Sequence, residues 1–386
     1  MIDQKLRTMD WNVTTMDQNL RAIDWNVTKT GQNLRTIDWE VVTMGKGLSS
    51  SFQALIADYD WITVAWRIYC ALYVIQYFYY PILAILGVPA NLLTIGILCR
   101  RKCGLSKCVT RYLVAMAVAD LLVIILDLIL RHIPIVYRAQ FLFLLSVPIC
   151  NIHAVLLYAA TDCSVWFTVT FTFDRFVAIC CQKLKSKYCT EKTAVVVLGT
   201  VTVLSCLKNI FWFFMLMTRY QLFNQSTFCY VTMAGLTKWF WGAIEFLNHS
   251  LTVLVPFVVI LLLNAMTVRH ILVSNRGRRR LRVQSNGENH RDPEMESRRK
   301  SIILLLVISA NFILLWTMLM VYWLWNRMFW LGYRSVPGVV REAGFMLQLL
   351  GCCTNTAIYA VTQTQFREQV KNVLKYPFIR IVKLIQ

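Results

Sequence analysis

The chain has 386 residues, of which 57% are hydrophobic and only 16% are charged. A soluble protein of this size could hardly bury so much apolar surface, because the buried fraction rises slowly with chain length. A formal net charge of +20 raises the question of nucleic-acid binding, which the distribution of the basic residues must decide.

Seven apolar runs are long enough to cross about 30 Å of hydrocarbon. In chain order they are residues 73–99, 110–130, 147–181, 193–217, 240–272, 300–325 and 342–362. None shows the two-residue alternation of a barrel strand, so each predicts a helix. The predicted fold class is an all-α membrane protein, a seven-transmembrane helix bundle over residues 71–363.

The basic residues are concentrated in alternate loops. Nineteen Lys and Arg lie in 100–111, 182–192 and 269–300, and seven lie in 131–146, 218–239 and 326–341. The positive-inside rule places the first set in the cytosol, the N-terminus outside and the C-terminus inside. The net charge therefore reflects membrane topology and attraction to the anionic lipid of the bilayer, and nucleic acid is not an expected partner.

The first seventy residues form a polar tail without an apolar signal segment. Residues 3–44 hold three copies of a fourteen-residue repeat, each with a tryptophan at the equivalent place. The composition predicts a disordered, glycosylated extracellular tail over residues 1–70. Glycosylation sequons on segments predicted to lie outside begin at Asn12, Asn26 and Asn224.

Thirteen cysteines raise the question of a metal site or a disulfide. No CxxC pair or histidine cluster has metal-ligand spacing, so no metal site is expected from these residues. Cys150 opens the third span on the outer side, and Cys229 lies in the outer loop before the fifth span. The oxidising exterior favours a disulfide between them, and the state of Cys70 stays open.

Polar residues inside the spans are the functional candidates, because charge within a membrane is costly. Asp120 lies midway along the second span, and Asp174 and Arg175 close the inner end of the third. The sequence from Asn355 to Tyr359 closes the seventh span, and Asn91 lies midway along the first.

With these motifs, residues 73–375 resemble the rhodopsin-like (class A) G-protein-coupled receptors. The interval from Cys150 to the Asp174–Arg175 pair and the gap between Tyr359 and Phe366 both match that family. The stretch ICNIHAVLLYAATDCSVWFTVTFTFDRFVAICC looks closest to orphan brain receptors that sense aromatic amino acids. The resemblance implies a heterotrimeric G protein and an extracellular small-molecule or peptide ligand as partners.

The resemblance also implies residue roles. The G-protein switch would comprise Asp174, Arg175, Asn355 and Tyr359. A polar cluster that binds a sodium ion in many relatives corresponds to Asp120, Ser164 and Asn355. Trp316 matches the aromatic toggle beneath the ligand pocket, with Phe312 one turn below. No other cofactor is expected.

The chain departs from the family pattern at several of these places. Met318 replaces the proline that follows the toggle, Thr356 replaces the proline of the seventh helix, and Asn264 replaces a tyrosine. Arg298 stands where many relatives have an acid, so the usual link from the sixth helix to Arg175 cannot form. We therefore expect a differently held resting state, with raised basal activity as a hypothesis.

Leu157 occupies the place of the aspartate that binds monoamines, so a monoamine ligand is not expected. Polar and aromatic side chains near the outer ends predict a pocket for a zwitterionic aromatic amino acid or a small peptide. The predicted pocket comprises Arg131, His153, Leu157, Glu245, Asn248, Trp316, Trp323 and Phe345. Equally, its polar members could form hydrogen bonds between helices.

After the seventh span, residues 364–386 predict a short amphipathic helix on the inner leaflet, ending at Pro377, and a cytoplasmic tail. The five histidines form no catalytic cluster, so the chain is not expected to be an enzyme. One alternative is an odorant-like chemosensory receptor. Another is a membrane transporter or channel, in which Asp120, Asp162 and Asp174 would relay charge.

Overall fold

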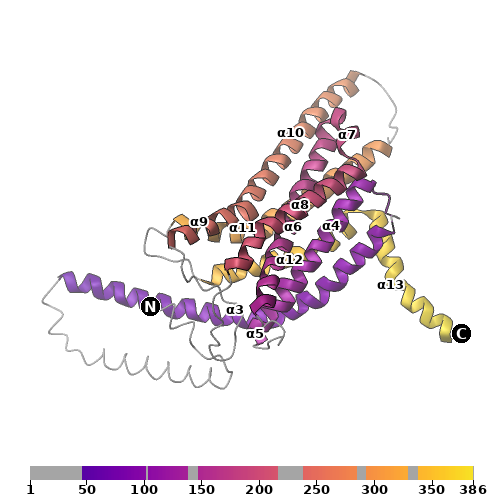
Figure 1. The fold of residues 1–386 in the computed structure, drawn as a ribbon. Coiled ribbons are helices and arrows are strands. Elements are labelled where there is room, and N and C mark those ends of the chain that lie inside the picture. The colour runs from indigo at the N-terminus through magenta and orange to yellow at the C-terminus, as the bar shows by residue number, and fades with distance from the viewer. Residues whose placement is uncertain are drawn as a thin grey trace. The chain divides into compact units, whose positions relative to one another are not determined.

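The computed structural model describes residues 46–100, 103–137, 147–215, 238–284, 293–328 and 338–385 (Figure 1). Within these ranges every regular element is helical. In chain order the elements are α3 (Lys46–Cys99), α4 (Lys107–Val123), η2 (Ile124–His132), α5 (Ile133–Tyr137), α6 (Val147–Cys180), α7 (Gln182–Tyr188), α8 (Glu191–Met215), α9 (Lys238–His249), η4 (Ser250–Leu254), α10 (Val255–Gln284), α11 (Pro293–Met328), α12 (Gly338–Thr362) and α13 (Thr364–Ile385).

Seven helical segments of the described chain are long and apolar enough to span a membrane, which confirms the predicted fold class. They are Cys70–Cys99, Lys107–Tyr137, Ile149–Cys180, Glu191–Phe213, Phe246–Ser274, Ser301–Trp325 and Val339–Thr362. The second span differs most from the expectation, because it does not end at residue 130 but continues through η2 and α5 to Tyr137. Arg131 and His132 therefore lie inside the span.

The chain divides into two units, Met1–Ala71 with Gln221–Thr227, and Leu72–Tyr220 with Phe228–Gln386. Of the first unit, residues 46–71 are described, and they are helical as the first part of α3. Helix thus covers the last part of the segment for which the sequence predicts a disordered tail. The repeats of residues 3–44 lie outside the described residues.

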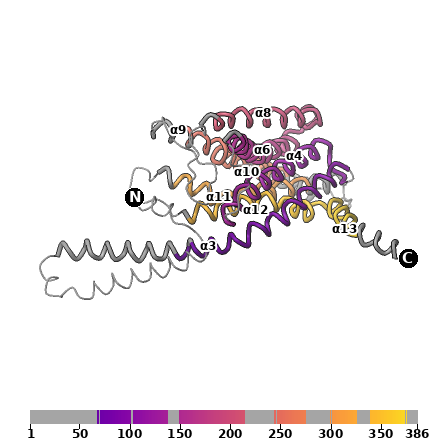
Figure 2. Tube along the Cα trace, turned by 60° about the horizontal axis from the view of Figure 1, so that its bottom comes forward, coloured from indigo at the N-terminus to yellow at the C-terminus, as the bar shows by residue number. Residues whose placement is uncertain are grey.

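Helix α6 is the centre of the second unit. It packs against α4, α8, α10 and α11, as well as against η2 and η4. Figure 2 shows α6 between α8 on one side and the layer of α11 and α12 on the other. Residues that α6 presents to its neighbours are buried along most of its length, so any polar side chain on it must find a partner within the bundle.

Two spans contain π-helical segments, η2 and η4. In a π-helix each backbone hydrogen bond joins residues that are one position further apart than in an α-helix, so the turn is wider. In η4 the amide of Val255 donates to the carbonyl of Ser250. Pro256 follows directly and has no amide hydrogen to give to Thr252, so the regular helical bond between these two residues is missing there. Such widened turns change the direction of the side chains that they carry.

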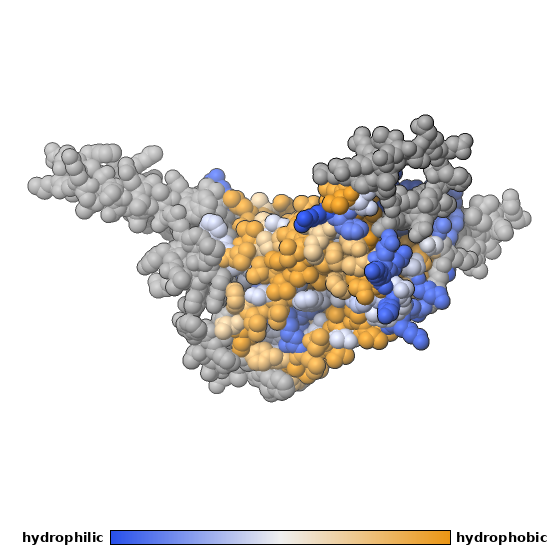
Figure 3. Space-filling view, turned by 90° about the horizontal axis from the view of Figure 1, so that it is seen from above, coloured by the Kyte–Doolittle hydropathy of each residue, from blue (hydrophilic) through white to orange (hydrophobic). Residues whose placement is uncertain are grey.

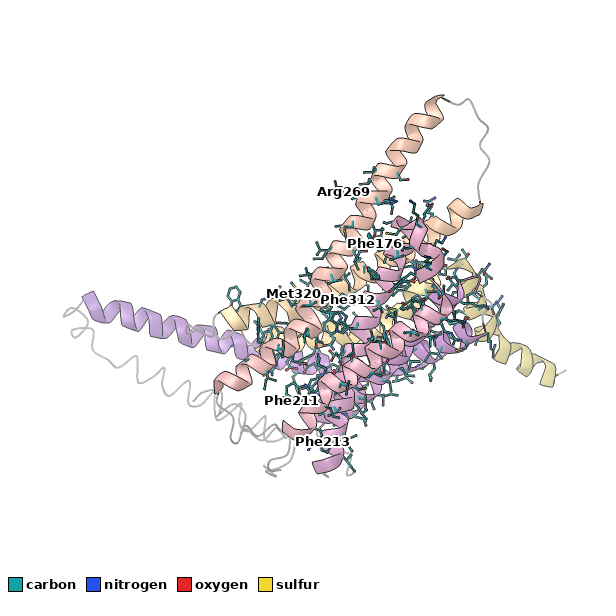
Figure 4. All side chains as sticks on the ribbon, turned by 45° about the horizontal axis from the view of Figure 1, so that its top comes forward. Phe176, Phe211, Phe213, Arg269, Phe312 and Met320 are labelled. Atoms are coloured by element: carbon teal, nitrogen blue, oxygen red, sulfur yellow. The ribbon has the colours of Figure 1, made fainter. Side chains whose placement is uncertain are left out.

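Large apolar side chains cover the outside of the bundle. Ile85 is 70% exposed and Leu314 is 71% exposed, a burial pattern that suits lipid rather than water. Figure 3 shows this apolar surface over much of one face, with hydrophilic residues gathered mainly toward one end. In Figure 4, Phe176 and Arg269 mark that end of the helices and Phe211 and Phe213 the opposite one. We call these the Arg175 end and the Cys150 end.

At the Arg175 end, Ser106 caps α4 by accepting a hydrogen bond from the amide of Val109 at 3.3 Å. Beyond α12, Phe366 of α13 is fully buried against Tyr359. Helix α13 does not end at Pro377, as the sequence predicts, but continues to Ile385. A proline removes one backbone hydrogen bond and can bend a helix without ending it.

Candidate functional site

The pair Asp174–Arg175 lies at the end of α6 and is buried. Asp174 is fully buried and Arg175 is 7% exposed. The Arg175 guanidinium donates two hydrogen bonds to Oδ2 of Asp174, of which the bond from Nε measures 2.9 Å. Removing one partner of such a buried pair leaves an uncompensated charge and costs about 3–5 kcal/mol.

Two thiols complete the surroundings of Asp174. Cys108 of α4 donates to Oδ1 at 3.2 Å, so the carboxylate is shared between a thiol and the guanidinium. Cys189 donates to the backbone carbonyl of Asp174 at 3.6 Å. Burial and the nearby carboxylate raise the pKa of the Cys189 thiol to about 12.

Arg175 also reaches helix α11. Its Nη1 donates to Oγ of Ser301 at 3.3 Å, and its guanidinium lies 5.9 Å from the ring centre of Phe171. Ser301 follows Arg298 by three residues, about one helical turn. The side chain of Arg298 lies outside the described residues. The neutral hydroxyl of Ser301 thus links Arg175 to α11, whereas many relatives make this link with an acidic residue at the position of Arg298.

Asp120 joins three helices in the middle of the bundle. It is 2% exposed, and its two carboxylate oxygens accept hydrogen bonds from Ser164 of α6 and Asn355 of α12, each at 2.6 Å. A buried carboxylate is stable only with such partners. The structure therefore places all three residues of the predicted polar cluster in direct contact.

The seventh helix is tied to α3 beside this cluster. Asn91 donates to the carbonyl of Cys352 at 2.9 Å. Thr356, which stands in place of a proline, donates to the carbonyl of Ala90 at 3.0 Å and lies 2.8 Å from the Thr94 hydroxyl. One turn further, the Tyr359 hydroxyl is buried without a hydrogen-bond partner among the described residues. The threonine thus adds an interhelical bond that a proline could not make.

Trp316 and Phe312 form a stacked pair on α11, with ring centres 5.4 Å apart. They belong to an apolar cluster that also contains Val253 of η4 and Ile260 of α10, with Trp323 and Phe345 packed against it. Met320 of α11, which Figure 4 labels together with Phe312, also packs against this cluster. A change in this cluster must therefore alter the packing between α10 and α11.

The predicted ligand residues divide into two groups in the structure. Arg131 belongs to a charged group: it pairs with Asp127 at 3.0 Å, and its guanidinium lies 5.5 Å from the ring centre of Phe345. His132 lies 3.5 Å from the same aspartate and 5.8 Å, centre to centre, from the Phe345 ring. The carboxylate Asp127 was not among the predicted residues, although its position four before Arg131 indicates a helical ion pair.

The other predicted ligand residues lie along α6, α9 and α11. His153 is within 2.8 Å of the Leu126 carbonyl, an interhelical bond, and Leu157 is 5% exposed. Asn248 is half-buried next to His249, whose ring lies 3.5 Å from that of Trp323. The Glu245 side chain lies outside the described residues. His249 was not among the predicted ligand residues, although a histidine inside an apolar span is itself a sign of a buried polar contact.

A second charged network, which no motif indicated, lies between α6, α8 and η4. Lys208 of α8 pairs with Asp162 of α6 at 2.8 Å, and Asp162 is 2% exposed. The signal in the sequence was a lysine within the apolar fourth span, because such a charge needs a buried partner.

Cys150 is disulfide-bonded. Its expected partner Cys229 lies outside the described residues, as do the sequons at Asn12, Asn26 and Asn224. Cys70 is a free thiol.

Residues 90–359, more than half of the chain, match the protein family described as 7 transmembrane receptor (rhodopsin family). The match confirms the resemblance that the motifs indicated. Members of this family are receptors that act on G proteins in response to a ligand, and they are not enzymes. The transporter or channel alternative is therefore not retained. The chain belongs to the rhodopsin family of seven-transmembrane, G-protein-coupled receptors.

Proposed function

We propose that this receptor responds to a zwitterionic aromatic amino acid or a small peptide at the plasma membrane, like the orphan brain receptors that its third span resembles. In this proposal the Cys150 end faces outward with the glycosylated tail of residues 1–70, and the Arg175 end faces the cytosol. The charge distribution of the loops supports this orientation.

The observation that carries the ligand proposal is the group around Arg131. A cation, a carboxylate from Asp127 and the face of Phe345 lie together near the Cys150 end. Glu342 adds a second carboxylate, which accepts a hydrogen bond from Gln76 at 3.4 Å. Charges of both signs beside an aromatic ring match the carboxylate, ammonium and side chain of an aromatic amino acid.

The switch in this proposal is the Asp174–Arg175 pair. In the closed arrangement Arg175 is held by Asp174 and touches α11 through Ser301. When α11 moves away, the guanidinium loses one of these partners and becomes available to a G protein. A buried ion pair whose cation can exchange one partner for another is a bistable element that a ligand can bias.

The Asp120 group is the proposed place for a sodium ion. A carboxylate and the Ser164 hydroxyl are the oxygen donors that such a cation prefers, and Asn355 could offer its amide oxygen after a rotation. When bound, the ion would neutralise the charge of Asp120. Among the described residues no cluster of three or more acidic, histidine or cysteine ligands occurs.

The test compares the parent receptor with Arg175→Ala at equal surface density. G-protein dissociation is followed by energy transfer across a panel of Gα subunits, with and without aromatic amino acids and amidated peptides. We expect a ligand response in the parent that Arg175→Ala loses. Absence of any response in the parent to every one of these compounds would refute the proposed ligand class, while leaving the family assignment intact.

A second pair of variants tests the ligand residues. Arg131→Gln should lower ligand potency by about tenfold or more, because one charge-assisted hydrogen bond is lost. Arg111→Gln is the matched control, since Arg111 pairs with Glu191 at 2.7 Å on the exposed surface of the other end. Equal effects of both substitutions would contradict the proposed site. Expression of the receptor in sensory rather than neuronal tissue would instead favour the odorant-like alternative.

A further inference from the structure

A closed polar network inside the membrane-spanning region joins α6, α8 and η4. The Lys208 ammonium lies 3.0 Å and 2.8 Å from the two carboxylate oxygens of Asp162. The Thr252 hydroxyl donates to Asp162 at 2.7 Å and accepts from Lys208 at 2.8 Å. Asn209 of α8 donates to the second carboxylate oxygen.

The network satisfies the charge of Asp162 completely. Each carboxylate oxygen has at least two partners, and the aspartate is 2% exposed. Such a group is costly in a membrane, and a lysine in the fourth span adds to that cost. An ion pair alone would need only α6 and α8. The additional feature is Thr252, which brings a third element, η4, onto the pair.

Thr252 is placed by the widened turn of η4, and that turn touches α11 on its other side. Val253, the next residue, packs in the cluster with Phe312 and Trp316. Three residues before Thr252, the His249 ring lies 3.5 Å from the Trp323 ring. The same short segment is therefore hydrogen-bonded to α6 and α8 and packed against the toggle residues of α11.

A movement of α11 at Phe312 and Trp316 acts directly on this segment, because Val253 packs against them. Helix α11 is continuous from Pro293 to Met328, so it connects the toggle residues to Ser301, which touches Arg175. Repacking of Phe312 and Trp316 requires η4 to move with them or to lose contact. Hydrogen bonds from Thr252 to a fixed ion pair oppose that movement, because polar groups inside a membrane cannot exchange protein partners for water.

We propose that Thr252 is a positioning residue which tethers η4 to the Asp162–Lys208 pair and thereby favours the closed arrangement of the receptor. The tether acts through the packing of η4 on α11 and does not require contact with a ligand. It rests on the receptor function of the family and is independent of which ligand binds.

The test uses two substitutions that each remove one hydrogen bond to Asp162. Thr252→Val removes the bond to Asp162 that reaches η4, together with the bond that Thr252 accepts from Lys208. Asn209→Ala removes a bond that stays between α8 and α6. At equal surface density, Thr252→Val should raise the ratio of open to closed receptor, measured as basal G-protein dissociation, by about tenfold or more, the effect of losing a well-formed hydrogen bond to a charged group. Asn209→Ala should leave the basal signal unchanged, and Thr252→Ser should restore the parent value.

The unfolding temperature, compared with the basal signal, shows whether Thr252 has a positioning role or a merely structural one. Both Thr252→Val and Asn209→Ala should lower the unfolding temperature of the solubilised receptor, but only the former should change signalling. If Thr252→Val is retained inside the cell, Thr252→Ala replaces it. An unchanged basal signal in the Thr252 variant at the surface would overturn the proposal, as would an equal rise in Asn209→Ala. Because no ligand is added, failure of the proposed ligand class does not affect this test.

Discussion

The hydrogen bond between Arg175 and Ser301 is the contact through which the switch should respond most directly to mutation. Ser301→Ala removes the hydroxyl that accepts from the guanidinium at 3.3 Å and leaves the Asp174 pair untouched. In the proposed switch this bond joins α6 to α11 in the closed arrangement, so its loss should raise basal G-protein signalling.

The magnitude follows from the geometry and burial of the bond. A hydrogen bond to a charged group contributes about 1.5–3 kcal/mol when it is well formed. At 3.3 Å the bond is long, so we take about 0.7–1.5 kcal/mol for the closed arrangement. Every 1.4 kcal/mol changes an equilibrium about tenfold, so the ratio of open to closed receptor should rise about three- to tenfold.

The assay is ligand-independent G-protein dissociation by energy transfer, normalised to surface density. Ser309→Ala is the control, because Ser309 is a buried residue of the same helix whose hydroxyl has no hydrogen-bond partner among the described residues. It should leave the basal signal unchanged. Ser301→Asp should act oppositely to Ser301→Ala, since a carboxylate beside Arg175 strengthens the closed arrangement. The reasoning fails if Ser301→Ala lowers the basal signal or if Ser301→Asp raises it.

Two further predictions concern Asp120 and Cys189. If Asp120 holds a sodium ion, replacement of sodium by an organic cation should change the ligand potency of the parent receptor by at least about threefold. The potency at Asp120→Asn, which lacks the charge, should not change. Equal sodium dependence of both proteins would disprove the site. The pKa of the Cys189 thiol is raised from 9.0 to about 12, so at pH 8 the folded receptor keeps it protonated and maleimide should label it more slowly than in the unfolded chain. Between pH 9 and 12 the thiol ionises in the unfolded chain first, so this group should lower the free energy of unfolding as pH rises. Labelling is measured by mass spectrometry, and fast labelling of the folded protein at pH 8 would show that the thiol is not shielded.

Much of the fold follows from composition and hydropathy alone. Each span is an apolar run, and the membrane leaves the backbone no option except a helix, so the seven spans could be predicted without tertiary information. Their ends were less accurate. The second span continues to Tyr137 because Arg131 and His132 find partners inside the bundle, and a charge normally taken as the end of a span therefore lies within it.

The residues that the motifs indicated at the centre and at the Arg175 end do lie together. Asp120 contacts both Ser164 and Asn355, and Arg175 pairs with its neighbour Asp174. Such groups were identifiable because charge and amide side chains are rare in apolar helices. The further partners of Asp174 and Arg175 could not be identified in this way, because Cys108 and Ser301 belong to no recognisable sequence pattern.

The sequence by itself determined that the chain crosses a membrane seven times and which buried charges need partners, because both follow from the cost of placing polar groups in hydrocarbon. Only the tertiary structure decided which partners they have. Lys208 and Thr252 lie 46 and 90 positions along the chain from Asp162, and the packing of three helices, with a widened turn before Pro256, brings them to one carboxylate. Pairing of this kind depends on the rotation and depth of each helix, which hydropathy does not specify.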